Sequence, residues 1–298
     1  MPLKIAKITK AIRNTVQFVI HHPLNQEQRW GALQRWLCWQ IGSRLVPGPV
    51  AVPFVNNTRL LVSPGMTGAT GNIYCGLHEF ESMAFASHLL RPNDLFLDVG
   101  ANIGSYSILA ASVGAKCIAF EPVPTTYGWL LENINLNKFE NLIDARNIAI
   151  GDRKGHLRMT TEFDTTNRVI RDSEQSMRGG VEVEVDTLNA VVGSLKPLLA
   201  KVDVEGYQSQ VIDGSGEILP KNSLLAVILE IDKSETELHQ RMLDFGFKPF
   251  GYLPFVRKLT PLLSINANAP NTIYVRDSET VSKILKSAPA VQVMSHRF

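Results

Sequence analysis

Two acidic side chains and a glycine-rich turn have the order and spacing of a nucleoside-binding site. Asp98 ends the apolar stretch LFLD, and Gly100, Asn102 and Gly104 follow it in VGANIGSYS. Glu121 stands at the end of a second apolar stretch, KCIAFE. An acid at the tip of a second strand, about 20 residues after such a turn, accepts hydrogen bonds from ribose hydroxyls, and the glycines let the backbone pass close to the ligand. These residues therefore predict a ligand that contains a nucleoside.

The same turn departs from two common phosphate-binding patterns. A dinucleotide site has G-x-G-x-x-G, whereas this turn has Asn102 between its glycines, and Asp98 would place negative charge beside a pyrophosphate. The P-loop pattern G-x-x-x-x-G-K-[ST] does not occur in the sequence. A cationic, phosphate-free adenosine compound fits better, and S-adenosylmethionine carries both an ammonium and a sulfonium group. A nicotinamide-dependent oxidoreductase and a turn that binds no ligand are the alternatives.

A second group of ionisable residues follows the strand expected at 199–203. Lys201 and Asp203 share one side of that strand, and Glu205 follows in KVDVEG. We expect Asp203 to contact the methionine end of the cofactor or the acceptor, and Lys201 to pair with Asp203 or to contact an acceptor oxygen. Asp203 is the first candidate for a general base, with Lys201 or His78 behind it. Glu205 is interpreted as a charge that caps the next helix.

The elements that must position these residues alternate between apolar strands and amphipathic helices. This alternation predicts an α/β fold with a parallel sheet that is wrapped by helices on both faces. Strands are expected near 95–98, 116–120, 143–149, 199–203 and 224–230, and helices near 78–90, 104–112, 125–137, 206–217 and 234–245. HLRMTTE and VEVEVDTL are additional strand-like pieces, and FKPFGYL and NTIYVR are expected to pair antiparallel at the sheet edge.

Three regions follow from this pattern. An N-terminal extension of helices and a β-hairpin is expected at 1–75, the main domain at 76–277, and a C-terminal helix and tail at 278–298. Within the extension, 1–45 is expected to be helical, 58–63 to form a strand or hairpin, and 64–72 to form a turn-rich loop.

The first helix has an apolar stripe from Ile5 to Val19 and basic residues on its other side. It either lies on an acidic membrane surface or docks on its own protein, and both interpretations stay open. No run of about 18 uncharged apolar residues occurs, so no transmembrane span is predicted, and the start is a poor secretory signal.

Charge and cysteine content restrict the partners and the compartment. The formal net charge of +2 predicts no strong attraction to nucleic acid. The 3 cysteines show no metal-type pairing and are interpreted as reduced thiols of a cytoplasmic protein, with a peripheral position at the inner face of the membrane as a variant of that interpretation. No oligomeric state is predicted.

Four motifs in this order, FLDVGANIGSYS, AFEPVP, NIAIGD and KVDVEG, resemble the FkbM family of S-adenosylmethionine-dependent methyltransferases. The resemblance spans about 78–276. It implies a Rossmann-like class I methyltransferase sheet, mostly parallel, with seven strands of which the last is antiparallel. One departure is that Tyr207 and Gln208 follow the DVEG motif, where the family often has a small residue and Glu.

The resemblance also implies roles for individual residues. Asp98, Gly100, Asn102 and Gly104 would form the cofactor turn. Glu121, followed by Pro122, would hold the ribose, Ala149 would contact adenine, and Asp203 matches the acid of the family after the fourth strand.

The activity implied by the resemblance is O-methylation of a hydroxyl on a sugar, glycan or related metabolite. Residues 163–169 and 251–271 are the candidate acceptor segments, with Tyr252, Phe255 and Arg257 as candidate contacts. No carboxylate set is spaced for a metal-assisted mechanism, so metal independence is expected. The alternative is a non-catalytic binding module that keeps the methyltransferase fold and associates with a membrane or partner protein.

Overall fold

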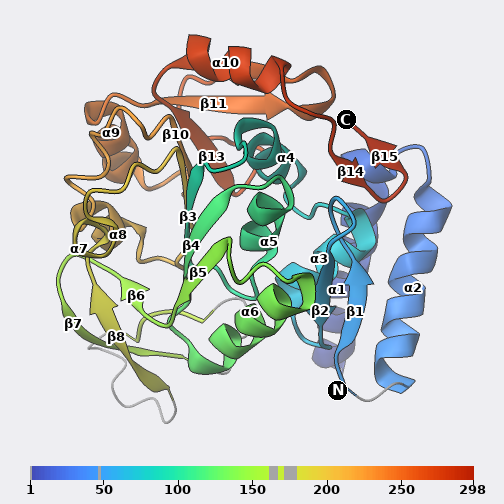
Figure 1. Cartoon of the computed structure of the whole chain (residues 1–298). Helices are drawn as coiled ribbons and strands as arrows, with labels where there is room; N and C mark the ends of the chain where they lie inside the picture. The colour runs from blue at the N-terminus through green and yellow to red at the C-terminus, as the bar shows by residue number, and fades with distance from the viewer. Residues whose placement is uncertain (1, 46–47, 161–166, 171–179) are drawn as a thin grey trace.

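A central sheet of eight strands organises the chain, in the order β12-β11-β13-β10-β9-β3-β4-β5 (Figure 1). The computed structural model describes residues 2–45, 48–160, 167–170 and 180–298, and gives only the backbone of 2–9, 67 and 68. The strands of the sheet are β3 (Leu95–Val99), β4 (Lys116–Phe120), β5 (Ile143–Arg146), β9 (Leu199–Val202), β10 (Ala226–Glu230), β11 (Lys248–Leu253), β12 (Lys258–Pro261) and β13 (Asn271–Val275).

The topology of this sheet places a crevice beside β3. Strands β5, β4, β3, β9 and β10 are parallel, β13 pairs antiparallel with both β10 and β11, and β12 pairs antiparallel with β11. The chain runs outward from β3 to β5 and then returns to β9 on the other side of β3, and ligands bind at such a reversal of strand order. The predicted class I methyltransferase sheet, with its antiparallel strand, is confirmed. The edge strand β12 is an addition that the sequence did not indicate.

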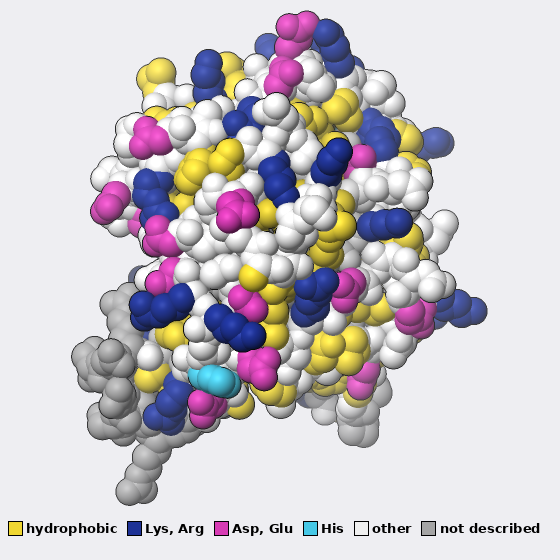
Figure 2. Space-filling view, turned by 60° about the vertical axis from the view of Figure 1, so that its left-hand side comes forward, with side chains coloured by type: hydrophobic (Ala, Val, Ile, Leu, Met, Phe, Trp, Pro, Cys, Tyr) yellow, Lys and Arg dark blue, Asp and Glu magenta, His cyan; other side chains and the backbone are white. Residues whose placement is uncertain are grey.

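Helices cover both faces of the sheet because each strand sends alternate side chains to opposite sides (Figure 1). Phe96 belongs to the core on the side of α4, α5 and α6, whereas Leu97 belongs to the core on the side of α8 and α9. The helices of the main domain and its C-terminal end are α4 (Phe80–Leu89), α5 (Ser105–Ser112), α6 (Pro124–Asn137), α7 (Leu188–Val192), α8 (Gln208–Asp213), α9 (Thr236–Asp244) and α10 (Ser278–Lys286), with the 3-10 turn η4 (Pro254–Val256). Positive and negative side chains alternate over the face that α7, α8 and α9 occupy (Figure 2).

The strand expected at 143–149 is two strands in the structure. β5 ends at Arg146, and β6 (Ala149–Ile150) joins a separate three-stranded sheet with β8 (Val181–Asp186) and β7 (Gly155–Met159). The side chain of Asn147, between them, donates to the backbone oxygens of Glu121 and Pro122 at 2.8 and 2.9 Å. This contact turns the chain across the end of β4. A short hairpin of β14 (Gln292–Val293) and β15 (His296–Arg297) ends the chain.

The N-terminal extension packs against the core of the main domain. It consists of α1 (Pro2–His21), η1 (Pro23–Asn25), α2 (Arg29–Leu45), the antiparallel hairpin of β1 (Val50–Pro53) and β2 (Arg59–Val62), and α3 (Thr67–Cys75). Val19 and Leu60 are buried in the same core cluster as Phe96. The Asn133 side chain of α6 accepts a hydrogen bond from the backbone N of Leu61 at 2.6 Å. Residues 5 and 8 of the predicted stripe lie outside the described side chains, and among the described residues no helix is both long and apolar enough to cross a bilayer.

The loop predicted at 64–72 is wrong, because α3 begins at Thr67. The glycines and small polar residues of this stretch have low intrinsic helix propensity. Burial of Ala69, Tyr74 and Cys75 in the core overrides that preference. Tertiary packing therefore decides the structure of this segment.

Candidate active site

Asp98 lies at the carboxyl end of β3, and its side chain is 1% exposed. Its Oδ2 accepts a hydrogen bond from Ser107 Oγ of α5 at 2.6 Å, whereas its buried Oδ1 has no partner among the described residues. Burial raises the pKa of this carboxyl, and the Lys201 ammonium opposes that rise. A buried carboxylate oxygen without a partner is rare in a native fold, so Oδ1 marks a position at which a ligand can donate a hydrogen bond or carry positive charge.

The turn after Asp98 has backbone angles that favour glycine at two positions. Gly100 has φ +83°, and a Cβ built on it would lie 1.8 Å from the carbonyl O of Asp203. Gly104 has φ +94°, and a Cβ there would lie 2.6 Å from Leu130 Cδ1. Asn102, between them, has φ +52° and accepts a hydrogen bond from the N of Ile103 at 2.7 Å through its side-chain Oδ1. The turn therefore fits closely between the end of β9 and helix α6.

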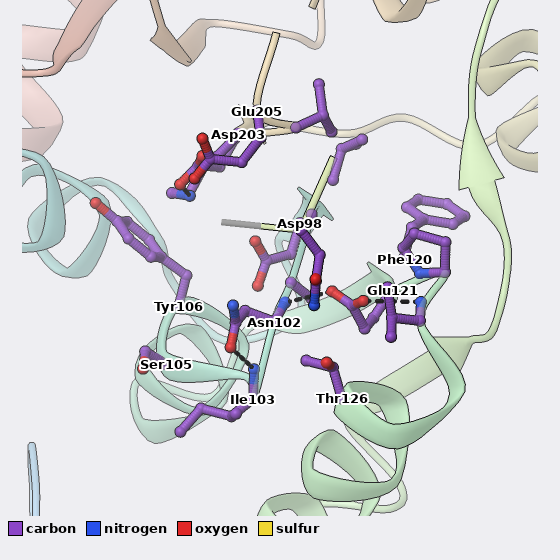
Figure 3. A pocket seen from close by; sticks show the side chains of 18 of the residues that line it. Asp98, Asn102, Ile103, Ser105, Tyr106, Phe120, Glu121, Thr126, Asp203 and Glu205 are labelled. Carbon is purple, nitrogen blue, oxygen red and sulfur yellow. Dashed lines mark hydrogen bonds and ion pairs between the residues drawn. The ribbon is translucent and has the colours of Figure 1, made fainter. Parts of the chain in front are cut away.

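Glu121, directly after β4, holds this turn in place. Its Oε2 accepts from the backbone N of Asn102 and its Oε1 from the backbone N of Val123, both at 2.9 Å (Figure 3). Burial raises the pKa of Glu121 to about 7, against the two backbone hydrogen bonds. Each carboxylate oxygen has a second lone pair, so both remain able to accept a hydroxyl. The sequence indicated the ribose role but not this structural one.

Lys201 and Asp203 form an ion pair at 2.6 Å, which is one of the two contacts expected for Lys201. Lys201 is 3% exposed, and its Nζ lies 4.7 Å from the ring centroid of Tyr106. Burial, the largest single cause, raises the pKa of Asp203, but the charge and hydrogen bond of Lys201 and a hydrogen bond with Glu230 together outweigh burial and lower it. Asp203 therefore carries a negative charge at neutral pH.

Glu230, at the end of β10, is a site residue that the sequence analysis missed. Burial and the neighbouring Asp203 raise its pKa to about 8, so it holds a proton at neutral pH. Carboxylate oxygens of Asp203, Glu205 and Glu230 lie within 4.8 Å of one another. The amide of Gln208 donates to Glu230 Oε2 at 2.9 Å, which a glutamate carboxylate at position 208 could not do. The sequence signal that could have identified Glu230 was an acidic residue at the end of one more predicted parallel strand.

Glu205 is not where the helix-cap interpretation places it. Helix α8 begins at Gln208, later than expected, and Tyr207 occupies the N-cap position. The backbone of Glu205 has φ +47°, and its side chain lines the cavity with Asp203. Its carboxylate belongs to the acidic group with Asp203 and Glu230.

A cavity of about 380 Å³ joins these groups into one site. Its lining includes most of the predicted residues: Asp98, Gly100, Asn102, Glu121, Pro122, Ala149, Lys201 and Asp203. Gly104 does not line it and instead caps α5. Residues that the prediction did not include line its other parts, among them Glu79, Tyr106, Ile148, Ile150 and Glu230. Glu79 accepts hydrogen bonds from Tyr106 Oη at 2.6 Å and from Asn271 Nδ2 at 2.7 Å.

The predicted acceptor segments differ in their relation to this cavity. Asn167 and Val169 line it, whereas 163–166 lie outside the described residues. Tyr252, Phe255 and Arg257 do not line it. Tyr252 is buried and its Oη bonds to Nδ1 of His88 at 2.7 Å, because β11 packs on α4 at the far edge of the sheet.

This sheet order, with acids at the tips of β3, β4 and β9 around one cavity, defines the class I methyltransferase fold. Residues 98–253, more than half of the chain, match the family described as Methyltransferase FkbM domain. The chain therefore belongs to the FkbM methyltransferase family.

Several characterised proteins are similar to parts of the chain. It is 28% identical over 139 residues to the hexuronic acid methyltransferase AglP of Haloferax volcanii, covering 47% of this chain and 56% of that protein. It is 37% identical over 79 residues to the 31-O-demethyl-FK506 methyltransferase FkbM of Streptomyces tacrolimicus, covering 26% and 30%. A tRNA(Phe) (4-demethylwyosine(37)-C(7)) aminocarboxypropyltransferase of Pyrococcus horikoshii is 42% identical over 66 residues, covering 22% and 24%. Each match spans less than two thirds of the relative's length.

Among solved structures, the methyltransferase FkbM of Methylobacillus flagellatus KT superposes with a TM-score of 0.43 at 14% identity. That match covers 64% of this chain and 47% of the other.

Proposed function

We propose that the chain is an S-adenosylmethionine-dependent O-methyltransferase. Membership of the FkbM family supports methyl transfer. The observation that carries the proposal is the unpartnered Oδ1 of Asp98, buried in a cavity that Glu121 and Asp203 also line. A cavity with this excess of carboxylates suits a cationic ligand.

The residues of the cavity fit S-adenosylmethionine group by group. Glu121 would accept the ribose hydroxyls through its remaining lone pairs. Ala149, with Ile148 and Ile150, offers an apolar wall for adenine. Asp98 and Asp203 offer negative charge for the methionine end. Lys201 is ion-paired with Asp203, so this buried ammonium partly balances the charge that Asp203 offers.

When bound, the cofactor would supply its methyl carbon, which forms a bond to the acceptor oxygen while the bond between that carbon and sulfur breaks. The electron pair of the broken bond stays on sulfur, and the hydroxyl proton passes to a base. The chain must hold that hydroxyl in line and exclude water. Asp203, with Lys201, remains the predicted catalytic pair. Its ion pair and lowered pKa make Asp203 a weak proton acceptor.

His78 is a second candidate for the base. It lines the same cavity, and its buried Nδ1 has no partner among the described residues. Burial lowers its pKa, so the imidazole is neutral at pH 7 and can accept a proton. If His78 is the base, His78→Gln should lower kcat while the Kd for the cofactor is unchanged. Asp203→Asn should weaken cofactor binding in either case, and a large loss of kcat at saturating cofactor in this variant, with His78→Gln fully active, would assign the base to Asp203.

The acceptor in this proposal is a hydroxyl of a sugar, glycan or related metabolite. The names of two relatives, a hexuronic acid methyltransferase and a 31-O-demethyl-FK506 methyltransferase, support this class. We place the activity in the cytosol, where the three free cysteines Cys38, Cys75 and Cys117 would stay reduced.

Calorimetry and mass spectrometry test the proposal. We expect the purified chain to bind S-adenosylmethionine and S-adenosylhomocysteine with micromolar or lower Kd, and one of them to copurify. A chain that binds neither compound, or that binds NADH instead, would refute the proposal. Binding without turnover on a panel of hydroxyl acceptors would favour the non-catalytic module.

Cofactor affinity is expected to depend on pH through Glu121. Its carboxylate must be ionised to accept two hydroxyls, and its pKa in the unliganded fold is about 7. Affinity should therefore fall as pH decreases below 7, by roughly fivefold to tenfold between pH 7.5 and pH 6. Calorimetry across this range measures the change. The Glu121→Gln variant, which cannot titrate, should bind more weakly with a flat profile, and a flat wild-type profile would contradict the assignment.

A further inference from the structure

A second cavity, of about 610 Å³, lies between α1, α2 and α3 of the N-terminal extension. Aromatic side chains supply much of its wall: Phe18, Trp36, Trp39 and Tyr74. Among the lining residues that the structure describes, none is a carboxylate, and Arg44 carries a permanent positive charge. Its volume is within the usual range for sites that bury a small organic ligand, and its lining combines these aromatic side chains with polar ones such as Gln40, Ser43 and Thr70.

The mouth of this cavity exposes apolar surface. Ile12 is 47% exposed and Phe18 is 39% exposed, although both line the cavity. Arg44, also exposed, lines the same cavity from α2. The rim therefore combines apolar side chains with positive charge, and water can reach the aromatic interior.

Helix α3 is a wall common to this cavity and to the active site. Ala69 and Asn72 line the active-site cavity, whereas Thr70, Gly71 and Tyr74 line the second cavity. The two cavities are therefore separated by the thickness of one helix.

At the end of this wall, His78 lines both cavities. A Cβ built on Gly71 would lie 2.1 Å from Nδ1 of His78, so the glycine lets the imidazole lie against the helix. The ring centroid of His78 lies 5.1 Å from that of Phe18, on the side of the second cavity. A ligand in the aromatic cavity would thus contact His78, a residue that also lines the active site.

We propose that the second cavity binds the hydrocarbon chain of the acceptor, while the hydroxyl to be methylated reaches the active site past His78. This inference rests on the proposed function and narrows its acceptor to a hydroxyl compound, such as a sugar, that carries a long alkyl or isoprenoid chain. The shared lining residue His78 places this cavity directly beside the active site, which favours an acceptor over an unrelated lipid. The cluster of aromatic side chains favours a hydrocarbon chain over a wholly polar ligand, and polar lining residues such as Gln40 and Ser43 lie beside that cluster.

Tryptophan quenching by a brominated alkyl maltoside, titrated into the full chain below its critical micelle concentration, tests this binding. Bromine quenches tryptophan on contact, and Trp36 and Trp39 line the cavity, whereas Trp30 and Trp129 do not. We expect saturable quenching that unbrominated dodecyl maltoside reverses and that maltose does not. A Trp36→Phe, Trp39→Phe double variant should lose at least about two thirds of the quenching. Competition by dodecanol and by farnesol distinguishes an alkyl chain from an isoprenoid chain.

Two matched variants on α1 locate the binding. Asn14 and Gln17 are both exposed, but only Asn14 lines the cavity. Asn14→Phe fills space in the cavity and should lower the affinity for the brominated probe by about fivefold or more, whereas Gln17→Phe should leave that affinity unchanged. Quenching that survives the double variant, that ignores Asn14→Phe, or that appears only with micelles would overturn the inference. Calorimetry with S-adenosylmethionine on both variants should match wild type. If the wild-type chain does not bind S-adenosylmethionine, the proposed function is refuted, whatever the quenching result.

Discussion

We expect the Asp98→Asn variant to bind the cofactor more weakly than wild type by about a hundredfold or more. Asparagine keeps the shape and an oxygen for Ser107 Oγ, but it removes a buried negative charge and can turn an NH2 group toward the ligand. Hydrogen bonds to a charged group contribute about 1.5–3 kcal/mol, and a mismatched donor adds to the loss. A hundredfold change in Kd corresponds to about 2.7 kcal/mol.

Stability and binding should separate in this variant. Folding raises the pKa of Asp98, so ionising this carboxyl costs more in the fold than in the unfolded chain. The free energy of unfolding therefore falls as pH increases from the ordinary pKa of an aspartate toward the raised value. Neutral asparagine relieves this cost, so the unliganded Asp98→Asn protein should melt at the same or a higher temperature than wild type. Calorimetry with both cofactor forms and a thermal melt measure the two effects.

Asp94 provides the control for Asp98. It precedes β3 and its Oδ2 accepts from the backbone N of Arg91 at 2.8 Å, outside the cavity. Asp94→Asn should leave cofactor affinity unchanged. If Asp98→Asn binds the cofactor within about threefold of wild type, the assignment of Asp98 is incorrect.

Gly100→Ala should destabilise the fold by about 3 kcal/mol or more and abolish cofactor binding. The added methyl would lie 1.8 Å from a backbone oxygen of Asp203, which cannot rotate away, and the φ of +83° adds strain for any L-residue with a side chain. Relief requires β3 and β9 to separate at the point where Asp98 and Asp203 meet the ligand. Urea denaturation, fitted by linear extrapolation, measures the loss.

Gly128 in α6 is the matched control for Gly100. A Cβ there would meet nothing within 4 Å, and its φ is not in the left-handed region. Gly128→Ala should therefore stabilise the helix by about 0.5–1 kcal/mol. A loss below about 1 kcal/mol for Gly100→Ala would show that the turn adapts, and it would remove the steric reason for glycine.

The part of the site that local patterns could predict lies on parallel strands that are adjacent in the sheet. Asp98 pairs in register with Ala119 of β4, so the acid two residues further on in the chain, Glu121, reaches the same crevice. Lys201 pairs in register with Asp98 and places Asp203 beside it. Strand alternation and the rule that parallel strands end at one edge are sufficient for these positions.

The remaining site residues depend on contacts between distant segments. Glu79 precedes α4 and receives hydrogen bonds from Tyr106 and from Asn271, and nothing local links these three positions. The raised pKa of Glu230 arises from burial and from Asp203, which a strand-end pattern does not report. Helix α3 was missed for the same reason, since its packing partners lie elsewhere in the chain.

Helix α3 lies between the active-site cavity and the second cavity, and this position determines how a ligand in one cavity can affect binding in the other. A displacement of this helix toward one cavity would narrow that cavity and widen the other, because residues of the same helix line both. Thermodynamic linkage then requires reciprocity: a molecule on one side that shifts α3 changes the affinity on the opposite side, and by the same factor in return. Small residues on the two sides of this helix, Ala69 and Gly71, keep the wall between the two cavities thin.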